Sequence, residues 1–140
     1  MISLPAPIPT GASVVVVTRD GVLMVERSSG VFAGRWSFPV GKIEPGEDAE
    51  TTARRELFEE ARITVGPMVR LGAFEPAPEL MPLRLTVFAA RSDGRRVTAG
   101  DDALRVAYVP FHAVLTRPTT PGAPGWIVRA LLALADPPLI

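Results

Sequence analysis

The hydrophobic pattern begins with four consecutive valines, which stand in a largely apolar segment from residue 13 to residue 18. β-Branched side chains at this density predict a buried strand. Asp20 and Gly21 predict a two-residue hairpin turn, after which residues 22–26 form a second predicted strand. Later segments predict extended structure at residues 35–39, 64–74, 83–90, 95–98 and 103–109.

The spacing of apolar residues changes between Ala49 and Ala61, a stretch without Gly or Pro. Ala49, Ala53, Leu57 and Ala61 recur every four residues, so they form one narrow apolar stripe that can lie against a sheet. Asp48 is the predicted N-cap, because its carboxylate can accept from the free N–H groups of the first turn. The sequence therefore predicts a helix over residues 49–61.

A second helix is predicted over residues 126–135, where Ile127, Leu131 and Leu134 share one face before Pro137-Pro138 ends the pattern. Strands joined by antiparallel turns, together with two helices, predict an α+β or α/β sandwich. A length of 140 residues suits one domain. We expect that domain to cover residues 1–140, with residues 1–11 as an extended N-terminal arm.

Composition excludes several classes of function. Lys and Arg balance Asp and Glu at 15 each, which argues against a long basic surface for nucleic acid. The chain has no cysteine, so disulfides, thiolate metal sites and cysteine nucleophiles are excluded. No apolar run approaches the roughly 20 residues of a membrane span, and residues 1–10 lack the positive region of a signal peptide. We therefore expect a cytoplasmic protein with neither a membrane nor a nucleic-acid partner.

The predicted helix over residues 49–61 carries a cluster of acidic residues. Glu56, Glu59 and Glu60 are spaced i, i+3 and i+4, so their carboxylates converge on one face. Such like charges repel one another, but oxygen ligands of this kind suit hard divalent cations such as Mg²⁺. The alternative is a solvated acidic helix face. A tight loop with Gly41, which ends in a further carboxylate at Glu47, favours the metal site.

Residues 41–63, GKIEPGEDAETTARRELFEEARI, resemble the Nudix box, whose pattern is G-x5-E-x7-R-E-U-x-E-E-x-G-U with U aliphatic. Eight of the nine specified positions match. The exception is the last glycine, which is Arg62 here, and Val40 stands where a second glycine is common before the box. The family glycine ends the box helix, where the backbone is often left-handed, so we predict a left-handed and strained Arg62. The alternative is that this helix ends differently, with Arg62 favourable to its C-terminal dipole.

The resemblance implies an α/β/α sandwich around a mixed sheet and the hydrolysis of a diphosphate linkage with Mg²⁺ or Mn²⁺. It implies a set of metal ligands and a set of supporting residues around them. The metal ligands would be Glu56, Glu59 and Glu60 with the backbone carbonyl of Val40 or Gly41, and Glu47 and Arg55 would support them. Glu56 and Glu59 are the candidate catalytic carboxylates. Glu56 is our choice of general base, although in this family a glutamate from a later loop can take that role.

The expected partner is a small-molecule nucleotide. Arg27 is a candidate phosphate contact, with a surface charge as the alternative, and Asp101 and Asp102 are candidate substrate contacts in a later loop. A rim carrying these aspartates with Glu75 and Glu79 would repel the extra charge of a triphosphate. An ADP-ribose-like substrate is therefore slightly favoured.

Three alternatives stay open. The chain could hydrolyse (deoxy)nucleoside triphosphates, or it could be a non-catalytic domain that senses a nucleotide. The apolar C-terminal helix and the proline-rich arm could also serve a homodimer. His112, the single histidine, falls in a predicted turn and is expected to have a surface role.

Overall fold

The computed structural model describes residues 7–100 and 103–140. Seven strands and three helices follow one another along this part of the chain. In order they are β1 Thr10–Val17, β2 Gly21–Arg27, β3 Trp36–Ser37, β4 Val40–Lys42, α1 Ala49–Ala61, β5 Val69–Phe74, β6 Arg84–Arg91, β7 Ala103–Pro110, α2 Phe111–Val114 and α3 Ala123–Leu134.

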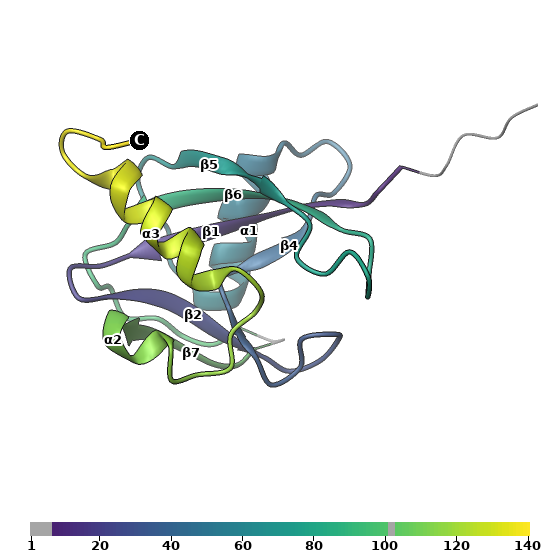
Figure 1. Cartoon of the computed structure of the whole chain (residues 1–140), viewed down its shortest axis with the longest axis horizontal. Helices are drawn as coiled ribbons and strands as arrows, with labels where there is room; N and C mark the ends of the chain where they lie inside the picture. The colour runs from purple at the N-terminus through teal and green to yellow at the C-terminus, as the bar shows by residue number, and fades with distance from the viewer. Residues whose placement is uncertain (1–6, 101–102) are drawn as a thin grey trace, which may run out of the picture.

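The strands form one mixed sheet in the order β3-β2-β1-β6-β5, with β4 also paired to β1 and β7 paired to β2. The central pair, β1 and β6, is parallel over its whole length, from Thr10 opposite Arg84 to Val17 opposite Arg91. The remaining pairings are antiparallel. Figure 1 shows α1 behind this sheet and α3 in front of it. The predicted α/β/α sandwich is therefore confirmed.

Strand β1 is buried on both faces, which explains its run of valines. Val14 and Val16 face α1 and pack with Leu57 in one hydrophobic cluster. Val15 and Val17 face the opposite side and pack in the cluster that contains Ile127 of α3. A strand covered by helices on both sides reads as a continuous apolar run rather than an alternating one.

The hairpin between β1 and β2 lies one residue earlier than predicted. Thr18 N–H donates to the carbonyl of Gly21 at 2.8 Å, so Arg19 and Asp20 are the two central residues. Gly21 is needed for a different reason from the one the sequence suggested. A Cβ at this position would lie 2.4 Å from the carbonyl oxygen of Val109, because β7 runs against β2 here.

Helix α1 has the bounds that the sequence predicts. The carboxylate of Asp48 accepts from the N–H of Thr51 at 2.8 Å, which confirms the N-cap. Arg62 ends the helix with φ 59° and ψ 33°, so the predicted left-handed conformation is also confirmed. Its N–H donates to the carbonyl of Phe58, and its guanidinium lies 5.7 Å from the Phe58 ring centroid.

The strand predicted at residues 95–98 is wrong. This segment instead supplies hydrogen bonds to the end of α1, where Thr98 N–H donates to the carbonyl of Ala61 and Gly100 N–H to that of Glu60, each at 3.0 Å. The last carbonyls of a helix have no partner within the helix, so these bonds satisfy them. A Cβ on Gly100 would lie 1.8 Å from the carbonyl oxygen of Glu59, so only glycine permits this approach.

Other boundaries also differ from the prediction. Strand β1 begins at Thr10, so residues 10 and 11 belong to the sheet and not to the predicted N-terminal arm. Residues 64–68 are not part of β5, which begins at Val69 after the Gly66-Pro67 break. Helix α3 begins at Ala123, three residues before the predicted start, because Pro124 lies in the first turn, where a missing N–H is tolerated.

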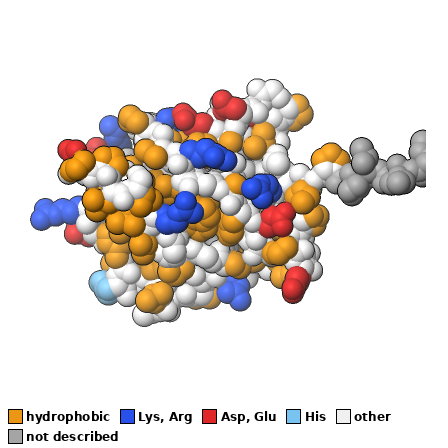
Figure 2. Space-filling model, turned by 45° about the horizontal axis from the view of Figure 1, so that its top comes forward, with side chains coloured by type: hydrophobic (Ala, Val, Ile, Leu, Met, Phe, Trp, Pro, Cys, Tyr) orange, Lys and Arg blue, Asp and Glu red, His pale blue; other side chains and the backbone are white. Residues whose placement is uncertain are grey.

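The outer surface mixes side chains of different kinds. On the face shown in Figure 2, hydrophobic, basic and acidic side chains are interspersed. Exposed apolar residues include Val128 and Leu131 of α3 and Leu139 and Ile140 at the C-terminus. Within residues 7–100 and 103–140, no helix is both long and apolar enough to cross a membrane.

Candidate active site

Glu60 lies at the most buried point of the acidic cluster. Only 7% of the residue is exposed, and its carboxylate is held from two strands. Oε1 accepts from Nη1 of Arg27 at 2.5 Å, at the end of β2. Oε2 accepts from the backbone N–H of Val40 at 2.9 Å, at the start of β4. Burial nevertheless raises the pKa of Glu60 to about 7, although the Arg27 charge opposes the rise.

Arg55 binds the loop that precedes α1. Its Nε and Nη2 donate to the two carboxylate oxygens of Glu47 at 2.7 and 2.9 Å, a bidentate pairing that adds geometric specificity. Nη2 also donates to the carbonyl of Lys42 at 3.1 Å. The hydrogen bonds from Arg55, and then from the Glu44 N–H, lower the pKa of Glu47 to about 2. The supporting pair that the resemblance implies is thus present as a contact.

Glu56 lies against the first glycine of the box. A Cβ on Gly41 would come within 2.1–2.6 Å of the Glu56 carboxyl group, so the glycine makes space for it. Oε1 of Glu56 accepts from Nη1 of Arg55 at 2.7 Å. Burial raises the pKa of Glu56, and the neighbouring Glu59 charge adds to the rise. Glu59 itself is more open, with 52% of its side chain exposed, and lies 3.3 Å from Nη1 of Arg55.

These carboxylates supply the hard oxygen donors that Mg²⁺ and Mn²⁺ prefer. In the part of the chain that the structure describes, no three acidic side chains stand together around a single cation position. Arg55 contacts Glu56 and Glu59 instead, and Arg27 contacts Glu60. The donor chemistry fits a divalent ion, and a cation would offset the repulsion between the half-buried Glu56 and the buried Glu60. The ligand roles of the three glutamates and the two carbonyls stay predictions.

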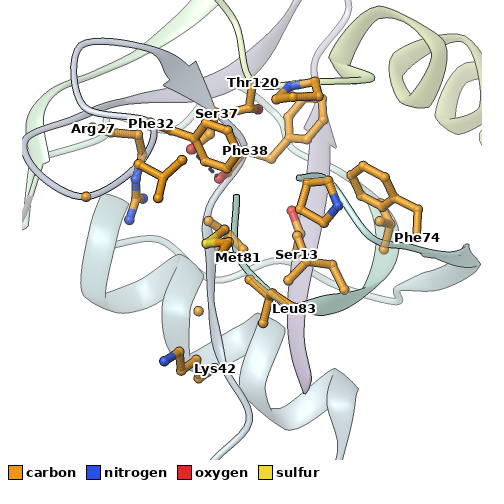
Figure 3. Close-up of a pocket in the computed structure, with 18 of the residues that line it drawn as sticks. Ser13, Arg27, Phe32, Ser37, Phe38, Lys42, Phe74, Met81, Leu83 and Thr120 are labelled. Atoms are coloured by element: carbon orange, nitrogen blue, oxygen red, sulfur yellow. Dashed lines mark hydrogen bonds between the residues drawn. The ribbon is translucent and has the colours of Figure 1, made fainter. Parts of the chain in front are cut away.

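A cavity of about 250 Å³ opens beside this cluster, on the α3 side of the sheet. Ser13 and Val87 come from the central strands and Trp126 from α3, while Arg27, Val40 and Gly41 join the cavity to the carboxylates. In Figure 3, Arg27 and Phe32 stand on one side, Phe74 on the other, and Ser13 and Met81 between them. The cavity is mainly apolar and aromatic, which is typical of small-molecule sites.

Ser13 and Lys42 are among the cavity residues that sequence reasoning missed. Ser13 is 4% exposed and lines the cavity, yet within the described chain its hydroxyl has no hydrogen-bond partner. Ser37, also 4% exposed, donates to the carbonyl of Phe38 at 2.9 Å and keeps acceptor capacity. For Ser13, a serine before four valines was the only available signal, and it does not distinguish a pocket residue from a strand end.

Only some of the residues predicted to contact the substrate line the cavity. Arg27 lines the cavity, as do Pro76 and Met81 from the segment 76–82. Glu75 and Glu79 are not among the described residues that line it, and Arg27 and Lys42 are its charged members. The two glutamates of the predicted acidic rim are therefore not part of this cavity wall. Asp101 and Asp102 lie outside the described residues. His112 is exposed on α2, away from the cavity.

Comparison with known proteins places this geometry in a family. The chain is 36% identical over 76 residues to an oxidized purine nucleoside triphosphate hydrolase of Mus musculus, covering 51% of this chain and 49% of that protein. It is 29% identical over 123 residues to an 8-oxo-dGDP phosphatase of Homo sapiens, covering 80% and 37%. The chain therefore spans about half or less of the length of these relatives.

Solved structures show the same fold. The NUDIX domain of Shewanella oneidensis NrtR, complexed with ADP ribose, superposes with a TM-score of 0.83 at 21% identity, covering 93% of this chain and 90% of that one. A MutT protein from Methanosarcina mazei superposes with a TM-score of 0.74 at 24% identity, covering 91% and 96%. The sequence model of the NUDIX domain matches residues 7–129. The chain belongs to the NUDIX domain family.

Proposed function

We propose that this chain hydrolyses a phosphoanhydride bond in a nucleoside diphosphate linked to another moiety, with Mg²⁺ or Mn²⁺ bound by Glu56, Glu59 and Glu60. One observation carries the proposal. The buried carboxylate of Glu60 and the half-buried carboxylate of Glu56 lie against the backbone of Val40 and Gly41, and these two backbone positions line an aromatic cavity. A cavity for a flat apolar group that ends at cation-binding oxygens suits a nucleotide.

The residues divide the work between positioning and proton transfer. When bound, the metal ion supplies charge stabilisation for the phosphate oxygens and lowers the pKa of a coordinated water. Glu47 and Arg55 hold the loop before α1 against the helix. Glu56 is the proposed general base, and its partly buried position raises its pKa toward the range in which a base works best. Arg27 and Lys42 are the cations placed to contact the phosphates.

A nucleoside di- or triphosphate is the first candidate substrate. The cavity wall carries Arg27 and Lys42 and, within the described residues, no carboxylate, so a second or third phosphate meets no repulsion there. The relatives named for 8-oxo-dGDP and for oxidized purine nucleoside triphosphates support this candidate. An ADP-ribose-like diphosphate is the second candidate, supported by the contribution of Pro76 and Met81 to the cavity wall.

A substrate panel with matched variants tests the proposal. Purified protein is assayed with dGDP, dGTP, their 8-oxo forms and ADP-ribose, each with Mg²⁺, with Mn²⁺ and with chelator. We expect metal-dependent turnover that Glu56→Gln and Glu60→Gln each reduce by about a hundredfold or more, a typical size for a lost acid–base group. Glu50→Gln is the control, because Glu50 lies on the same helix but pairs with Arg54. Equal turnover in all four proteins would refute the assignment.

A further inference from the structure

Arg27 lies between the buried carboxylate of Glu60 and the cavity. Its Nη1 contacts the buried carboxylate of Glu60, and the same side chain lines the cavity. One quarter of the Arg27 side chain is exposed, against 9% of the Glu60 side chain. The alternation of β2 explains the placement, because Leu23 faces α1 and Arg27 lies four residues further along the same face.

Glu60 needs a cationic partner in this position. A buried carboxylate is stable as an anion only when a charge and hydrogen bonds compensate for lost water. The Val40 N–H supplies one hydrogen bond, and Arg27 supplies the charge. A divalent ion held by Glu60 would supply a compensating positive charge as well. Two cations on one carboxylate repel each other, so the ion and the Arg27 guanidinium compete for Glu60.

We propose that Arg27 is the counter-ion that Glu60 exchanges for the metal, and that the released guanidinium then contacts the phosphates of a nucleotide in the cavity. This inference rests on the proposed metal-dependent function. In the metal-free protein, Arg27 lines the cavity while its guanidinium neutralises Glu60, so its charge is not available to the phosphates. With metal bound, Arg27 is a positioning residue for the substrate. Metal and nucleotide therefore favour each other through one side chain, and this coupling is reciprocal for binding free energies.

Binding measurements separate this exchange from a fixed phosphate contact. Mn²⁺ affinity is measured by titration calorimetry for the wild type, Arg27→Met, Arg27→Ala and Arg19→Ala. Methionine keeps an unbranched stem without the charge, so it covers the case in which alanine fails to fold. Arg19 is the charge-matched control, since it lies in the turn that precedes β2, at the opposite end of that strand from Arg27. We expect Mn²⁺ to bind the Arg27 variants about fivefold or more tightly than the wild type, with Arg19→Ala within twofold.

The same proteins are titrated with the α,β-methylene analogue of dGDP, which is not cleaved at that bond. We expect Arg27→Met to weaken its binding about fivefold or more when Mn²⁺ is present and by less than twofold in chelator. Unchanged or weaker Mn²⁺ binding by the Arg27 variants would overturn the exchange. An equal loss of analogue affinity with and without metal would also overturn it, because Arg27 would then face the phosphates permanently. A wild type that binds no Mn²⁺ would overturn the proposed function as well.

Discussion

Removing the charge of Glu60 should stabilise the metal-free protein at high pH. Burial raises the pKa of this carboxyl from 4.5 to about 7, and its side chain is only 9% exposed. A tenfold change in a protonation constant corresponds to about 1.4 kcal/mol, so folding with the charge present costs about 3 kcal/mol. Glutamine has nearly the same shape and carries no charge. Glu60→Gln should therefore recover up to about 3 kcal/mol of the free energy of unfolding.

The sign of the pH dependence follows from the direction of the shift. A group whose pKa rises on folding binds its proton more tightly in the folded state. Its contribution to stability is fully present below pH 4.5 and is lost as the pH rises through 7. Glu47, whose pKa is lowered to about 2, behaves in the opposite way and loses its contribution only in strong acid. Between pH 5 and 8.5, the difference in free energy of unfolding between the wild type and Glu60→Gln therefore comes from the titration of Glu60.

The assay is urea unfolding in chelator at pH 5 and pH 8.5, with the midpoint and slope fitted for each protein. We expect nearly equal stability at pH 5 and a more stable Glu60→Gln variant at pH 8.5. Millimolar Mg²⁺ should remove most of this difference, because only the wild type keeps the Glu60 carboxylate as a metal ligand. Binding to the folded state adds RT ln(1 + [L]/Kd), about 2.7 kcal/mol at a hundredfold excess over Kd. A variant less stable than the wild type at pH 8.5 in chelator would refute the reasoning, since the Arg27 ion pair would then outweigh burial.

Three further experiments test the fold and the cavity. Gly100→Ala should lower the free energy of unfolding, measured in urea, by about 2 kcal/mol or more, because its Cβ would lie 1.8 Å from the carbonyl oxygen of Glu59. The control is Gly125→Ala in α3, which has open space around it and should be neutral or stabilising. In thermal unfolding, Arg62→Gly should be about 1 kcal/mol more stable than Arg62→Ala, since only alanine keeps the left-handed strain, and equal stabilities would contradict this. Ser13→Ala should leave the melting temperature unchanged and raise KM for the best substrate severalfold. An unchanged KM would remove the serine from the site.

The sequence predicts best where the structure depends on neighbouring residues. The bounds of α1, its Asp48 cap and the left-handed Arg62 follow from local hydrogen bonding and helix propensity, and all three are confirmed. Strand β1 followed from its run of valines, and β6 followed from a segment that alternates and then runs apolar. For the site, the pairing of Arg55 with Glu47 is implied by the family resemblance, and both residues belong to the same loop and helix.

Features that depend on distant segments could not be found in the same way. Residues 95–98 have a strand-like composition, but the unsatisfied carbonyls at the end of α1 take their hydrogen bonds. Arg27 and Glu60 are 33 residues apart, so no spacing rule joins them. The wall of the cavity combines residues from Ser13 to Trp126, and the acidic rim expected from the 75–82 segment is not part of it. Which side chains share a cavity is set by sheet order, and one sequence does not determine that order.

The two departures from the box pattern share a physical reason. At Val40 the backbone N–H contacts Glu60, so a side chain there does not remove the hydrogen bond and instead adds an apolar surface to the cavity wall. At Arg62 the backbone keeps the conformation that favours glycine, and the guanidinium near the Phe58 ring offsets part of the strain. Both positions act through the backbone. Replacing the family glycine at Val40 or at Arg62 therefore changes less than the family pattern suggests. Gly41 is different, because the Glu56 carboxyl group occupies the space that a Cβ would need.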